Sequence, residues 1–299
     1  MKTLKGILAA GLMVLALTGC GQSTEDVPVE SRMVSLNIGA NIQLSTEIAE
    51  WGSGTDSDLE MNGTSRAETC PVNRLAFVLL NEKGEKVVSQ EKGSDESGFL
   101  TLQARVPIGT YELIAFGHKG AKNAVVGTDA SVGLSGEKLT DSFLHYSELV
   151  LEDNVAKEKE ITLKRCVSRI SVKCKDDVPA DAATIEIKVS GAGNVLDART
   201  GFAKELSEQQ MVFQIPSDVI GETEISFSGY LFLASKEDVV DLEVTVKDAD
   251  GEVMTNHQLK DVPVKVNVKT ICSGVLFHAN QSLNATFDAE WDGTEDVEF

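Results

Sequence analysis

The side chains of this sequence that could take part in catalysis or metal binding are its histidines, cysteines and carboxylates. None of them forms a known catalytic pattern. Each histidine is isolated, so we expect surface or hydrogen-bonded core residues at His118, His145, His257 and His278. There is no Gly-x-Ser-x-Gly elbow, P-loop, HExxH helix or GxGxxG loop, and the carboxylates are too dispersed to mark a glycosidase pair. The residues therefore predict no catalytic site and no enzyme. A hydrolase whose site is assembled only by folding is the rival interpretation.

The cysteines do not suggest a metal site. Neither a CxxC nor an HxxxH spacing occurs, so we expect no zinc, no other metal and no cofactor. Cys166 and Cys174 fall in one alternating run, where they would face the same side about 26 Å apart, beyond disulfide reach. Any bridge must use Cys70 or Cys272, and buried thiols are an equal alternative, so the disulfide state stays open.

Cys20 stands at the end of an export signal. Lys2 and Lys5 precede an apolar run from Ile7 to Leu17, which at about 1.5 Å per residue is too short to cross a membrane. We interpret residues 1–19 as a signal peptide. The ending Leu17-Thr18-Gly19-Cys20 is similar to the lipobox of bacterial lipoproteins, which implies a lipid on Cys20. Ordinary secretion is the alternative. The polar residues 20–30 would then form a lipidated tether.

Composition limits the classes of partner. The chain has 299 residues, is 42% hydrophobic and carries a formal net charge of −20, so it is expected to be globular and not to bind nucleic acid. No later segment is long and apolar enough to span a membrane as a helix.

Alternating apolar and polar residues dominate the rest of the chain and predict a mainly β protein with antiparallel strands. The alternating segments are Leu75–Leu80, Phe99–Val106, Tyr111–Phe116, Ile161–Val172, Ile185–Val189, Ile225–Leu233, Val239–Val246, Val262–Val268, Cys272–Phe277 and Leu283–Trp291. Hairpin turns are expected at Asn81–Gly84 and Asp248–Gly251, where glycine supplies a positive φ. The aspartates of the Asp248–Gly251 turn lack the remaining ligands that a calcium-binding loop would need.

Few short helices are expected. Gly136–Tyr146 has apolar residues at helical spacing, which favours a short amphipathic helix or a structured loop, and Phe202–Met211 is a second candidate. We place a division near residue 165, which gives a β-sandwich at 31–165 and another at 166–299. The segment Ile161–Val172 would run as one strand from the first into the second.

A series of local signatures in this order resembles the fimbrillins and the fimbrial anchor or tip lipoproteins of the Bacteroidales. They are the lipobox at Cys20, Leu75–Gly84, Val106–Gly117 with its Pro-Ile-Gly-Thr-Tyr start, Glu160–Arg165 leading into Val167–Ile170, and Val262–Thr270 ahead of Gly274 and a terminal strand ending at Trp291. The resemblance covers most of the mature chain. It implies two tandem transthyretin-like, Greek-key β-sandwich domains.

The resemblance also implies assembly. In that family, stalk subunits are cut after an arginine that follows the first strand, and a neighbour's donor strand fills the groove. Here the first strand would lie within Met33–Leu44, and Arg66 matches the processing site. Anchor subunits keep this strand, so an uncut Arg66 is the alternative. The short acidic tail Asp292–Phe299 favours an anchor or tip subunit over a stalk subunit.

The implied partners are other fimbrial subunits, the outer membrane through the lipid, and a host or bacterial surface ligand. The alternative function is that of a monomeric surface lipoprotein that binds carbohydrate. Exposed coplanar aromatic side chains would favour it, and the aromatic content is only 5%.

Overall fold

The fold described is that of a computed structural model, which covers residues 32–43, 70–134, 136, 138–152, 156–278 and 283–288. Within these residues the chain is almost entirely β, and the one helical element is a 3-10 turn, η2 (Ser217–Val219). The predicted signal peptide and tether, Cys20 and Arg66 lie outside the described residues.

The N-terminal half forms a seven-stranded sheet in the order β3-β2-β5-β8-β9-β1-β4. Its strands are β1 (Met33–Gln43), β2 (Arg74–Asn81), β3 (Lys86–Gly93), β4 (Thr101–Pro107), β5 (Gly109–His118), β8 (Ser142–Leu151) and β9 (Lys157–Arg165). β8 and β9 are paired at two positions, Phe143 with Arg165 and Leu144 with Lys164, and then separate. The sheet therefore folds at this point into two layers, β3-β2-β5-β8 and β9-β1-β4, which enclose one apolar core.

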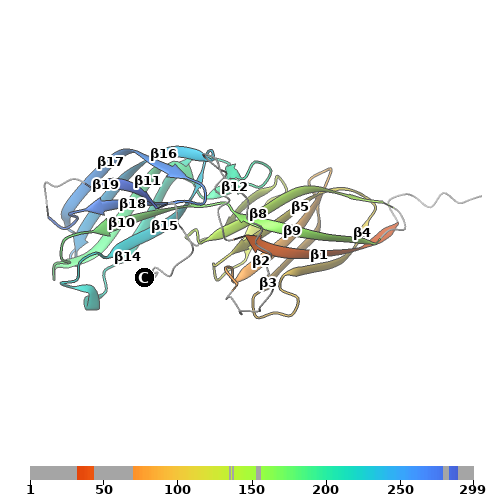
Figure 1. The fold of residues 1–299 in the computed structure, drawn as a ribbon, viewed down its shortest axis with the longest axis horizontal. Coiled ribbons are helices and arrows are strands. Elements are labelled where there is room, and N and C mark those ends of the chain that lie inside the picture. Colours follow the sequence, from red (N-terminus) through yellow and green to blue (C-terminus); the bar gives the residue numbers. More distant parts are fainter. Residues whose placement is uncertain are drawn as a thin grey trace, which may run out of the picture.

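The C-terminal half is built in the same way (Figure 1). Its eight-stranded sheet contains β10 (Ser168–Cys174), β11 (Ala182–Gly193), β14 (Ser207–Gln214), β15 (Ser226–Leu233), β16 (Glu237–Asp248), β17 (Val253–Lys265), β18 (Lys269–Gly274) and β19 (Asn284–Asp288). β11 meets β15 only at Ala192 and Gly193, so the layers β17-β16-β11-β14 and β15-β10-β18-β19 close over a second core. The first strand of each half lies parallel to a late strand: β1 to β9, and β10 to β18.

A small third sheet joins the halves. It consists of β6 (Ala124–Val126), β7 (Ser131–Leu134), β12 (Val195–Asp197) and β13 (Phe202–Ala203), and β7 pairs with β12 across the division. Its apolar side covers the outer faces of β2 and β5, where Val78 and Phe116 pack in one cluster with Leu196 and Phe232. Both faces of β2 are therefore buried. The chain is a pair of β-sandwiches joined by a shared hydrophobic core.

The predicted mainly β class with tandem sandwiches is confirmed, as are the turns at Asn81–Gly84 and Asp248–Gly251. The helix suggested at Phe202–Met211 is wrong, because this segment contributes to β13 and β14. Of the two alternatives for Gly136–Tyr146, the helix is wrong: its described residues are irregular up to Asp141 and then enter β8. The single strand expected over Ile161–Val172 is two strands, β9 and β10.

Candidate functional site: the first strand and its outer groove

The inner face of β1 is a row of apolar side chains. Its sequence alternates, and the four inward residues Val34, Leu36, Ile38 and Ala40 are all buried, with at most 5% of their surface exposed. They pack against the core of the N-terminal half. Burying aliphatic side chains of this size stabilises a fold by roughly 1.5–3 kcal/mol each, so β1 is a large contributor to the sandwich.

Both edges of β1 are paired. It runs antiparallel to β4, from Met33 opposite Pro107 to Gly39 opposite Thr101, and parallel to β9, from Leu36 to Gln43. Without β1, the facing edges of β4 and β9 would lose their hydrogen-bond partners, and the pockets for its four inward side chains would open. The fold thus inserts the first strand of the chain between two later strands, β4 and β9.

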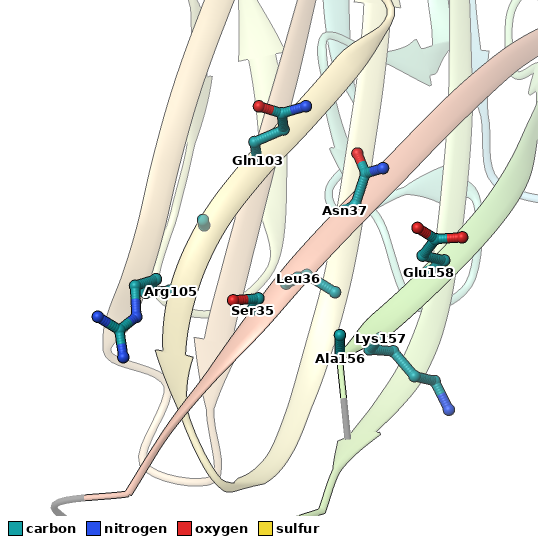
Figure 2. A pocket seen from close by; sticks show the side chains of 9 residues that line it. Ser35, Leu36, Asn37, Gln103, Arg105, Ala156, Lys157 and Glu158 are labelled. Carbon is teal, nitrogen blue, oxygen red and sulfur yellow. The ribbon is translucent and has the colours of Figure 1, made fainter. Parts of the chain in front are cut away.

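The outer face of β1 forms the floor of a depression of about 460 Å³ with a mixed polar and apolar lining, which we call the outer groove (Figure 2). Five of its polar side chains come from three neighbouring strands: Ser35 and Asn37 on β1, Gln103 and Arg105 on β4, and Glu158 on β9. Lys157 on β9 also lines it. The register places Ser35 opposite Arg105, and Asn37 between Gln103 and Glu158. Figure 2 shows the side chains of Asn37, Gln103 and Glu158 on the same side of the ribbon.

These five side chains make no hydrogen bond or ion pair with one another or with any other described residue. The neighbouring polar positions behave differently: Asn41 Nδ2 lies 3.5 Å from Glu160 Oε2, and Gln90 donates to the Thr101 carbonyl. The outer groove therefore presents donors and acceptors that are available to a ligand.

Gly39 gives room for a side chain that crosses β1. A Cβ built at this position would lie 2.2 Å from Glu160 Oε1, which shows that the Glu160 carboxylate occupies the space above the glycine. From there it reaches Asn41.

A second polar cluster fills the seam where β8 and β9 separate. His145 Nδ1 lies 3.0 Å from the Thr162 carbonyl, and its Nε2 lies 3.1 Å from Ser147 Oγ. Lys159 Nζ donates to the same hydroxyl at 3.0 Å. Burial lowers the pKa of His145, and burial together with repulsion from Lys157 lowers the pKa of Lys159. The cluster satisfies polar groups that the strands themselves leave unpaired there.

The remaining histidines also have structural partners. His118 contacts Glu91, His257 contacts the Leu276 carbonyl, and His278 contacts Asp176. Our expectation of surface or hydrogen-bonded core histidines is confirmed. Among the described residues, no group of three or more His, Cys, Asp or Glu side chains could hold a metal ion, and no helix has the length and apolar character needed to span a membrane.

The sequence predicted the position of β1 but not the outer groove. Cys20 and Arg66 fall outside the described residues, so both remain predictions. Of the outward polar residues, Gln103 and Arg105 on β4 lie in a segment that was predicted from alternation. The convergence of β1, β4 and β9 was not predicted, because a parallel pairing between residues about 120 positions apart has no local sequence signal.

The architecture defines a class: a two-sandwich β protein with its first strand inserted between later ones. A solved adhesin candidate from Bacteroides ovatus shares this fold at 14% identity and a TM-score of 0.50, over 82% of this chain and 88% of that one. A candidate polysaccharide-binding protein from Bacteroides thetaiotaomicron matches at 10% identity and a TM-score of 0.49, over 86% of this chain and 96% of that one. The C-terminally truncated tip fimbrial protein Mfa3 of Porphyromonas gingivalis matches at 11% identity and a TM-score of 0.40, over 85% and 99%.

The chain belongs to a family of unknown function, DUF6562, whose model matches residues 123–299. The match includes the C-terminal half and the strands from β6 onward, whereas β1 to β5 precede it. None of the proteins with a curated description matches the sequence.

Proposed function

We propose that this protein is an accessory subunit, of the anchor or tip type, of a cell-surface fimbria, with a role in adhesion. It would be held in the outer membrane by a lipid on Cys20 and spaced from the bilayer by residues 20–30. Two acyl chains would give stable attachment, whereas one would bind only reversibly. Its partners would be other fimbrial subunits.

The observation that carries the proposal is the position of β1. The strand is joined to the rest of the described chain only through the segment between Gln43 and Cys70, yet it completes the sheet between β9 and β4. An anchor subunit would keep β1, whereas a cut after Arg66 would make β1 a separate chain. A donor strand from another subunit could then pair with the same backbone groups and fill the same four pockets.

Two further observations support assembly. The order of the N-terminal sheet ends at β3 and β4, so each of these strands has one edge without a paired strand in the described residues. The shared fold of the Bacteroides ovatus adhesin candidate agrees with a role in adhesion. The alternative of a stacking carbohydrate platform gains no support, since none of the phenylalanine and tyrosine side chains whose burial the structure describes is exposed.

Strand exchange in vitro tests the proposal. A recognition sequence for a specific protease would be inserted directly after Arg66, and a fluorescent peptide with the sequence Met33–Gln43 would be added before and after cleavage. We expect the cleaved protein to take up the peptide and the intact protein not to do so. A peptide with Leu36→Asp and Ile38→Asp serves as the control, because charges cannot enter the pockets. Equal uptake by intact and cleaved protein, or none by the cleaved protein, would contradict strand complementation.

A further inference from the structure

We propose that the outer groove binds an uncharged, hydroxyl-rich oligosaccharide through Ser35, Asn37, Gln103, Arg105 and Glu158. The groove volume of about 460 Å³ lies within the range of small-molecule sites. None of the five side chains is engaged by another described residue, so binding breaks no internal hydrogen bond.

The chemistry of the lining selects the class of ligand. Asn37 and Gln103 each offer donors and an acceptor, Arg105 offers donors, and Glu158 offers acceptors. A sugar hydroxyl both donates and accepts, so this mixed set is complementary to a neutral polyol. An anionic ligand would be attracted by Arg105 and Lys157 but opposed by Glu158, by the adjacent Glu160 and by the net charge of −20.

The register gives the site its dimensions. Glu158, Asn37 and Gln103 form one row across three adjacent strands. With strands about 4.8 Å apart, the row spans roughly 10 Å, which suits two linked sugar rings lying across the strands. Ser35 and Arg105 form a second row beside it.

The groove has no aromatic lining, so each site is expected to bind weakly. Weak sites suit a surface protein that is present in many copies, because simultaneous contacts multiply the affinity.

Two of the five side chains belong to β1, so the site exists only while β1 is in place. A ligand stabilises the state that binds it, so a bound oligosaccharide should hold β1 in the sheet and oppose strand exchange. This inference rests on the proposed function.

The test is a titration of the mature protein in which NMR chemical shifts report binding. The uncharged probes are maltohexaose, cellohexaose and laminarihexaose, and the charged probe is hexagalacturonate. We expect at least one uncharged probe to bind, and the double variant Asn37→Ala with Gln103→Ala to weaken its binding about tenfold or more. Gln258→Ala, an exposed amide on β17, is the matched control and should leave the dissociation constant unchanged.

Failure of all three uncharged probes to bind, unchanged binding in the double variant, or a preference for hexagalacturonate would overturn the proposal. Hydrogen exchange of the β1 amides then tests the coupling: exchange should slow when the bound probe is present. Binding with unchanged β1 exchange would overturn the coupling alone. The peptide assay, which uses no sugar, decides strand exchange independently.

Discussion

Arg165 holds Asp141 through two buried hydrogen bonds, from Nε to Oδ1 at 2.7 Å and from Nη2 to Oδ2 at 2.9 Å. Its Nη1 donates to Asn267 Oδ1 at 2.9 Å. Asn267 lies in the turn between β17 and β18 with φ of 61°, in the left-handed region that asparagine tolerates. One arginine at the end of β9 therefore ties the N-terminal half to the C-terminal half.

Replacing this arginine should be costly. Arg165→Met leaves the Asp141 carboxylate buried without its counter-ion, and the expected loss in the free energy of unfolding is about 3–5 kcal/mol. Urea denaturation followed by fluorescence measures it. Lys188→Met is the control, since the exposed Lys188–Glu243 pair is separated by 3.9 Å and contributes at most about 1 kcal/mol. Equal losses in the two variants would show that the buried pair has no special role.

Glu91 should make stability depend on pH. Burial raises the pKa of its carboxyl group, but hydrogen bonds from His118, Arg74 and the Ala124 N–H together outweigh burial and lower it. A lowered folded-state pKa gives stability that is complete above the unfolded-state pKa and is lost as the pH falls through the folded-state value. Comparing unfolding at about pH 7 and about pH 3.5, we expect Glu91→Gln to lose less stability on acidification than the wild type. If the variant and the wild type lost the same stability on acidification, Glu91 would be excluded as a cause of the pH dependence.

Two glycines should differ in their tolerance of alanine. A Cβ at Gly193 would lie 2.4 Å from the Glu205 carbonyl oxygen, which is backbone, whereas at Gly39 the obstacle is the mobile end of the Glu160 side chain. We expect Gly193→Ala to destabilise the protein by about 1–3 kcal/mol and Gly39→Ala to have a smaller effect. Thermal unfolding of both variants measures the difference, and the reverse order would contradict the packing at β11.

The four thiols that follow Cys20 should be unpaired. Cys70 is half-buried, whereas the others are buried. Burial raises the pKa of Cys166 and Cys174, and that of Cys272 to about 12, which keeps these thiols in the unreactive protonated form. In protein that begins at Gly21, iodoacetamide should modify Cys70 alone in the native state and all four after unfolding. Mass spectrometry counts the adducts, and fewer than four after unfolding without reductant would reveal a disulfide.

Lipidation at Cys20 predicts a defined mature terminus. Protein extracted from its own cell surface should begin at Cys20 and carry the mass of acyl chains, and Cys20→Ser should release it from the membrane fraction. The same spectrum reports whether the chain is cut after Arg66. A mature terminus elsewhere, without added mass, would favour ordinary secretion.

Alternation in the sequence predicted most of the sheet strands, including β2, which is covered on both sides, but not β8. Phe143 packs in the core of the N-terminal half, whereas its neighbour Leu144 contacts the cluster between the halves. Consecutive apolar residues on opposite faces mimic helical spacing, which is why Gly136–Tyr146 suggested a helix. The covering third sheet, made from both halves, has no local sequence signal.

The sequence predicted the candidate site in part, for a similar reason. The resemblance placed the first strand within Met33–Leu44, and the structure confirms a strand there with Val34 to Ala40 alternating toward one buried side. The neighbours of this strand could not be predicted, because the pairing of Asn37 with both Gln103 and Glu158 depends on the topology of the whole sandwich.

The parallel pairing of β1 with β9 has a consequence for biosynthesis. Leu36 lies opposite Ala104 on one edge of β1 and beside Lys157 on the other, so the edge that pairs with β9 must wait for more than a hundred further residues before that partner exists. Such a long separation makes closure slow. The earliest-made strand therefore gains β4 first and its second neighbour, β9, only after most of the N-terminal half has been made.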